Sequence, residues 1–137
     1  MKGNSGLCLT LAHTFTFALA AHAALGVDLQ PSVAPPQPLA TNVTWTAKAS
    51  GDSGATVWYR FRSRALAGGI TSAGFMMRRP PAPPDFSVVR DFGPSNTLDW
   101  TAAEHEGAYE IEVVARDLST GETAVAVSRF EIGRAHV

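Results

Sequence analysis

The chain has 137 residues, of which 11 are Lys or Arg and 12 are Asp or Glu. This length suits a single domain, and the hydrophobic share of 45% is ordinary for a globular protein. The formal net charge of −1 argues against a nucleic-acid-binding protein, because such a protein needs clustered Lys and Arg to neutralise phosphates. We therefore expect no nucleic-acid partner.

The first residues, 1–23, have the pattern of a secretory signal peptide. Lys2 precedes the almost uncharged stretch LCLTLAHTFTFALAAHAALG, which ends in small residues. Ala21-His22-Ala23 fits the cleavage signal, so we expect an exported chain, periplasmic or extracellular, that begins at Ala24 and no longer contacts the membrane. An uncleaved anchor is the alternative, although the stretch is barely long enough to span a bilayer and contains His13.

The single cysteine of the chain, Cys8, lies within this leader. The exported part is therefore expected to have no disulfide. Many small exported domains depend on disulfides, so this one must depend on its hydrophobic core, which about 100 residues are able to supply.

Alternating apolar and polar residues predict two strands after a proline-rich opening segment, 27–41, which suits an edge strand. In NVTWTAKAS, 42–50, Trp45 lies on the more apolar face. In ATVWYRFRSR, 55–64, Tyr59 and Phe61 share one face, and three arginines share the opposite one.

The segment ALAGGITSAGFMMRRPPAPP, 65–84, interrupts the alternation. Gly68-Gly69 and four prolines predict a long connection that ends in a polyproline stretch. We consider its centre a candidate partner-binding loop, because Pro-rich segments dock in aromatic grooves. A stiff surface loop without a partner is the alternative. The candidate residues are Met76, Met77, Arg78 and Arg79.

Four further strands are predicted, at 85–92, 97–102, 108–118 and 123–132. In the last of these, Val125 and Val127 alternate out of phase with Phe130 and Ile132. A β-bulge near Ser128-Arg129 would place all four side chains inward. About seven short strands without a helical period predict an all-β, two-sheet antiparallel sandwich over residues 24–131. We expect its core to centre on Trp45, Tyr59, Phe61, Trp100, Tyr109, Ile111 and Val113.

The segment LDWTAAEHEGAYEIEVVARDLSTGETA resembles bacterial immunoglobulin-like and fibronectin type III-like repeats. Tyr109 follows Gly107 at a strand start, where the tyrosine corner of such sandwiches lies and its hydroxyl bonds back to the preceding loop. Ala102 stands where the repeats usually have proline. The fold class is therefore expected to be an immunoglobulin-like antiparallel β-sandwich.

A wider string is more specific: PSVAPPQPLATNVTWTAKASG, then YRF, then FSVVRDFGPSNTLDWTAAEHEGAYEIEVVARD. It looks like the sandwich that opens exported aryl-sulfate sulfotransferase-like proteins of soil bacteria, and more weakly like the sandwich of three-tyrosine sensor proteins. The resemblance implies a catalytic histidine on a β-propeller farther along the chain. No segment here matches that propeller, so no catalytic residue is assigned.

Two other groups of residues are candidates for a site. His105 lies between Glu104 and Glu106, but neighbours on an extended chain point to opposite faces. We expect a solvated turn there, with no metal or cofactor. Arg60, Arg62 and Arg64 form either an anion or partner patch or an ordinary charged outer face.

The second interpretation of the arginines gives a geometric prediction. In an immunoglobulin-like sandwich the third strand pairs with the sixth. Arg60 and Arg62 would then lie on the solvated face near Glu110 and Glu112, and at least one arginine should reach one glutamate.

The last six residues, 132–137, read IGRAHV and fit the codons ATC GGA AGA GCA CAC GTC, a string that looks like a sequencing adapter. We expect these residues to be a non-native tail and the natural protein to continue past Glu131. A native tail is the alternative.

The sequence favours a non-catalytic accessory or structural module at the N-terminus of a truncated exported bacterial protein, with a downstream domain of the same parent as its partner. One alternative is the N-terminal fragment of an aryl-sulfate sulfotransferase-like enzyme whose propeller is missing. The other is an adhesive or sensor repeat module.

Overall fold

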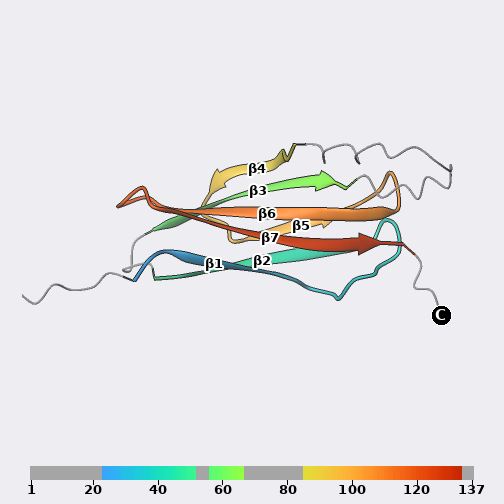
Figure 1. The fold of residues 1–137 in the computed structure, drawn as a ribbon, viewed down its shortest axis with the longest axis horizontal. Coiled ribbons are helices and arrows are strands. Elements are labelled where there is room, and N and C mark those ends of the chain that lie inside the picture. Colours follow the sequence, from blue (N-terminus) through green and yellow to red (C-terminus); the bar gives the residue numbers. More distant parts are fainter. Residues whose placement is uncertain (1–22, 52–55, 67–84, 134–137) are drawn as a thin grey trace, which may run out of the picture.

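The computed structural model describes residues 23–51, 56–66 and 85–133, which form two antiparallel sheets facing each other (Figure 1). This confirms the all-β, β-sandwich prediction. No helix occurs among these residues, and so none with the length and hydropathy that a membrane crossing needs. The strands are β1 (Gly26–Pro31), β2 (Asn42–Ser50), β3 (Val57–Ala65), β4 (Ser87–Gly93), β5 (Thr97–Thr101), β6 (Gly107–Asp117) and β7 (Thr123–Ile132).

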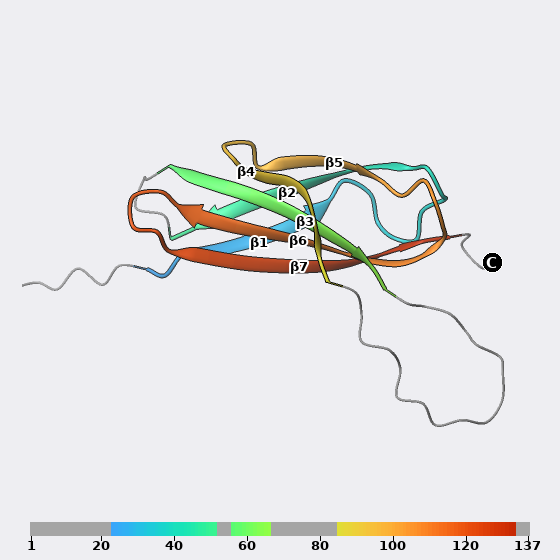
Figure 2. The ribbon, with the colours of Figure 1, turned by 90° about the horizontal axis from the view of Figure 1, so that it is seen from above.

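The two sheets have three and four strands. Their orders are β1-β2-β5 and β4-β3-β6-β7, and Figure 2 views the four-stranded sheet from above. The predicted pairing of the third strand with the sixth is confirmed, because β3 and β6 pair over nine residues from Val57↔Asp117 to Ala65↔Tyr109. The outermost strands are therefore β1 and β5 in one sheet and β4 and β7 in the other.

The core lies between the sheets and is built from the inward positions of the alternating strands. Phe130 of β7 contacts two tryptophans edge to face, with ring centroids 5.5 Å from Trp45 and 6.2 Å from Trp100. Six of the seven predicted core residues are buried, and the seventh, Tyr109, is partly buried against the same cluster. The predicted strand phase is thus confirmed for both tryptophans.

The predicted bulge in β7 is wrong. All ten of its residues from Thr123 to Ile132 pair with β6 without a register shift. Ala124 and Ala126 face inward, whereas Val125 and Val127 are 57% and 50% exposed. Since β1 lies close to β7 on the inner side, small alanines suit the inward positions and the valines face outward.

The chain enters and leaves the sandwich at opposite ends, as Figures 1 and 2 both show. At the first end, Gly51 has φ +74°, and a Cβ there would lie 2.2 Å from the carbonyl oxygen of Ala24, so only glycine fits. At the other end, Gln37 N–H donates to Glu131 O and Gly133 N–H donates to Gln37 O. Ile132, expected to begin the tail, ends β7 and is buried.

Candidate functional site

Two ion pairs lie on the outer face of the four-stranded sheet, between β3 and β6. Arg62 lies opposite Glu112, and its Nε donates to Glu112 Oε1 at 2.6 Å. Arg64 lies opposite Glu110 and donates to Oε2 through Nε at 2.9 Å and through Nη2 at 2.6 Å. The prediction that Arg60 or Arg62 reaches one of these glutamates is confirmed by Arg62.

Arg60 itself faces no glutamate, because the ladder places it opposite Val114. Its guanidinium carbon lies 4.8 Å from the ring centroid of Phe92 in β4, and that of Arg116 lies 4.2 Å from the same ring. In the described part of the chain neither arginine has a carboxylate partner, and the buried Arg60 Nε has no hydrogen-bond acceptor. This half of the face is cationic and is held to β4 by cation–π contacts.

A second ring, Phe86, extends this arrangement beside the ion pairs. The guanidinium carbons of Arg62 and Arg64 lie 5.4 and 4.2 Å from its centroid. The four outward arginines of β3 and β6 therefore all contact an aromatic ring at or beside β4. These contacts attach the edge strand β4 to the sheet. They favour the interpretation of the arginines as an ordinary charged outer face over that of an anion or partner patch.

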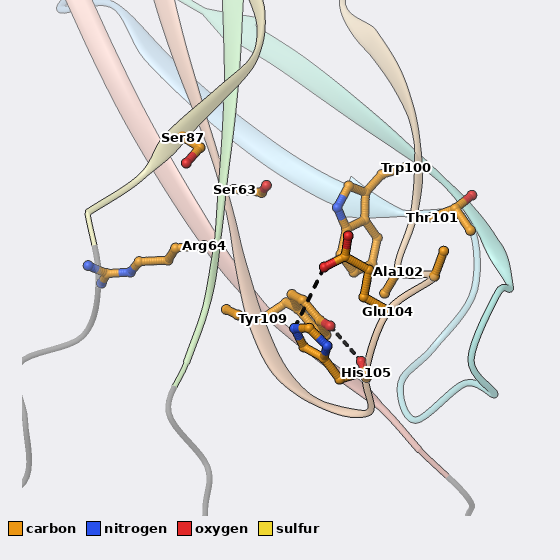
Figure 3. Close-up of a pocket in the computed structure, with 11 residues that line it drawn as sticks. Ser63, Arg64, Ser87, Trp100, Thr101, Ala102, Glu104, His105 and Tyr109 are labelled. Atoms are coloured by element: carbon orange, nitrogen blue, oxygen red, sulfur yellow. Dashed lines mark hydrogen bonds and ion pairs between the residues drawn. The ribbon is translucent and has the colours of Figure 1, made fainter.

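A pocket of about 360 Å³ lies between the ends of β3, β4 and β6 on one side and β5 with its following loop on the other (Figure 3). Trp100 and Tyr109 form its apolar wall, with their ring centroids 5.3 Å apart. The other lining residues have polar or small side chains. The lining residues are Ser63, Arg64, Ala65, Ser87, Trp100, Thr101, Ala102, Ala103, Glu104, His105 and Tyr109.

The polar groups of the pocket do not form a catalytic arrangement. His105 Nε2 is 4.0 Å from Glu104 Oε2, and the side chains are 66% and 86% exposed, so solvent weakens the pair. Ser63 and Ser87 lie apart from the imidazole in Figure 3, whereas a nucleophilic serine needs a base within hydrogen-bond reach. Among the described residues no three His, Cys, Asp or Glu side chains gather as metal ligands would.

Tyr109 instead has a structural role at this pocket. Its hydroxyl donates to the carbonyl oxygen of His105 at 2.5 Å, which confirms the predicted bond of a tyrosine corner. Burial, and secondly the charge of Glu104, raise the pKa of the phenol. Gly107, with φ +141°, turns the chain between loop and strand in a backbone region that side chains rarely adopt.

The candidate partner-binding residues lie outside the described residues, and so the structure does not place them. The sequence reasoning missed the contacts of Phe86 and Phe92. A signal for them was present, because aromatic residues flank the expected strand 85–92 and arginines occupy the outward positions of the strand before it.

The chain matches no protein-family model, no curated protein and no solved structure. The resemblance to the sandwich of aryl-sulfate sulfotransferase-like proteins therefore gains no support from these comparisons. It stays an expectation drawn from the sequence.

Proposed function

We propose that this chain is a non-catalytic, immunoglobulin-like module of a longer exported bacterial protein, and that it holds a downstream domain in line with itself. The observation that carries this proposal is that the first and last described residues, Ala23 and Gly133, lie at opposite ends of the sandwich (Figure 1). A module connected in this way separates its neighbours by its own length.

The attachment of both ends supports a rigid spacer. Before β1, Leu25 N–H donates to Glu122 Oε1 at 3.0 Å. At the other end, Gln37 N–H donates to the carbonyl oxygen of Glu131 at 3.2 Å, so the last residue before the expected tail is bonded to the segment after β1. Because both flanking segments are bonded to the sandwich, its orientation is transmitted to the downstream domain.

The immunoglobulin-like assignment rests on three features. The strand orders β1-β2-β5 and β4-β3-β6-β7 include the pairing of the third strand with the sixth that such sandwiches have. Tyr109 makes the bond of a tyrosine corner. Gln37, which follows the first strand, forms a parallel bridge with Ile132 of the last.

Long-read sequencing of the source locus tests the proposal, because it reveals the codons after Glu131. We expect an open reading frame with a further domain. Propeller repeats would favour the sulfotransferase-like parent, and further sandwiches would favour an adhesive or sensor array. A genomic stop codon directly after Val137 would leave no domain to position and would refute the proposal.

Deletion of the sandwich from that longer protein is the second test. We expect the kcat of the downstream domain to be unchanged in the deletion variant, and the present chain alone to show no turnover of the same substrate. If deletion of the sandwich abolished the activity, the sandwich would contain a catalytic residue and the proposal would be wrong.

A further inference from the structure

Among the described residues, β7 is an edge strand whose backbone groups on one side are unpaired along most of its length. It pairs with β6 on one side only, and in Figure 2 it forms one long side of the four-stranded sheet. On the other side, Glu131 and Gly133 bond to Gln37. Backbone groups alternate sides along a strand, so the same alternation directs the N–H and C=O groups of Val125, Val127 and Arg129 to the open edge.

The other three edge strands carry features that discourage further pairing. β1 ends at Pro31. β5 has five residues. β4 is irregular, with register shifts against β3 between Tyr59 and Phe61 and between Phe61 and Arg62. β7 has ten residues in regular register, without proline or bulge, and is therefore the edge best prepared to accept another strand.

The outward side chains at the centre of this edge are apolar. Val125 and Val127 lie opposite Val114 and Glu112 of β6, and each valine is about half exposed. The cation nearest along the strand, Arg129, pairs with Glu131 at 3.5 Å. Two neighbouring valines on an edge of regular register expose apolar surface in the position where edge strands usually carry charge.

We propose that a second copy of this chain occupies the edge, with the two β7 strands pairing antiparallel about a two-fold axis at Ala126. In this register Val125 of each copy lies opposite Val127 of the other, which gives two valine–valine pairs. Thr123 of each copy lies opposite Arg129 of the other. No like charges oppose each other. The symmetric contact joins two four-stranded sheets into one of eight strands.

The alternative registers and partner edges are less favourable. A register centred on Val127 would place Val125 against Arg129 of the second copy and would leave one valine–valine pair in place of two. Pairing of β7 with β4 of another copy would meet the irregular strand. The self-complementary pairing is the one that uses all four valines and two regular edges.

The contact is small, so the dimer is expected to be weak. The residues between Thr123 and Arg129 supply far fewer than the roughly 20–30 residues per side of a standard stable interface. Association should therefore appear at micromolar concentrations and above, and not at nanomolar ones.

Sedimentation velocity of the full chain, from about 2 to about 200 µM, measures this equilibrium. We expect the mean mass to rise toward that of a dimer. Val127→Lys should weaken association by at least about tenfold, since it replaces a buried apolar contact by a charge on both sides of the axis. Val88→Lys, at an equally exposed valine of β4 (55%), is the matched control and should associate like the unmodified chain.

Two outcomes would overturn the proposal. One is a chain that stays monomeric over the whole range. The other is association that Val127→Lys leaves unchanged or that Val88→Lys weakens equally. Should the lysine variant fail to fold by circular dichroism, Val127→Thr keeps the strand preference and should still weaken association, with Val88→Thr as its control.

Hydrogen exchange locates the contact independently of the variants. The N–H groups of Val125 and Val127 should exchange more slowly at high protein concentration than at low concentration, because the second copy accepts their hydrogen bonds. Association without this added protection would assign the dimer to another surface and would refute the β7 pairing.

Discussion

β4 and β7 form opposite edges of one sheet, yet they are attached to it in different ways. β7 pairs with β6 in unbroken register and sends Phe130 and Ile132 into the core. β4 pairs irregularly with β3, and most of its side-chain contacts lie on the outer face, where Phe92 stacks on Arg60 and Arg116. Its contact with the core is Arg90, which lies 5.0 Å from the ring centroid of Phe61. An edge anchored through the core leaves its outer face free for contacts, whereas an edge anchored through its outer face does not.

The largest effect expected from this comparison concerns the two phenylalanines that anchor the edges. Phe130→Ala should lower the free energy of unfolding by about 3–5 kcal/mol, because Phe130 is fully buried between two tryptophans. Phe92→Ala should cost only about 1–2 kcal/mol, since it removes two partly exposed cation–π contacts. Urea unfolding followed by tryptophan fluorescence measures both. Equal losses would show that β4 is anchored as deeply as β7.

The ion pairs between the edges should have the next effect. A double-mutant cycle of Arg62→Gln with Glu112→Gln should give a coupling of about 1–2 kcal/mol, because the Glu112 side chain is only 8% exposed. The same cycle at Arg64 and Glu110 should give less, since that carboxylate is more exposed. A larger coupling at the second pair would contradict this order.

The pocket lies on the β4 side of the sheet. Replacing Tyr109 tests how much its hydrogen bond to the loop before β6 contributes to stability. Tyr109→Phe should lower the free energy of unfolding at neutral pH by about 1 kcal/mol, the usual net value of one hydrogen bond. Burial raises the pKa of the phenol above its ordinary value. The stability that Tyr109 contributes is therefore fully present at a pH below the pKa of tyrosine in the unfolded chain. It is lost as the pH rises through the higher pKa of Tyr109 in the folded chain.

Urea titrations at a series of alkaline pH values check that sign. The difference between the unmodified chain and Tyr109→Phe should shrink as the pH is raised past the ordinary tyrosine range. A difference that grows with pH would mean that the folded state favours the phenolate.

The smallest effect is expected for a single exposed arginine on the β4 side. Arg116→Gln should cost roughly 0.5–1 kcal/mol through its contact with Phe92. Arg129→Gln on β7 is the matched control, because the ion pair of that arginine with Glu131 is exposed, and its change should stay within about 0.5 kcal/mol. Thermal unfolding followed by circular dichroism compares the two. Equal shifts would remove the special role of the aromatic contacts.

The sequence predicted the strands and their inward faces well, because period-two alternation is a local property. The expected spans of β2 and β7 agree with the structure at both ends. The bulge in β7 was predicted wrongly because larger apolar residues were assumed to face inward. The space beside β1 instead admits Ala124 and Ala126.

The candidate site was less predictable, because it depends on distances between strands. Arg60 was expected near a glutamate, but the register of β3 against β6 moves the pairs to Arg62 and Arg64. The stacking of Phe92 on two arginines depends on the irregular register of β4. The pocket exists because two edge strands of different sheets end near one another, and no local pattern carries that information.

The order of the strands has a consequence for how the chain acquires its structure. β2 and β3 both lie in the first half of the chain, but their partners β5 and β6 come much later. Such non-local pairing makes folding slow, in the range of milliseconds to seconds. Because β3 has no central neighbour until β6 is present, the early strands cannot close a core of their own, and folding can be completed only when the last strand is available.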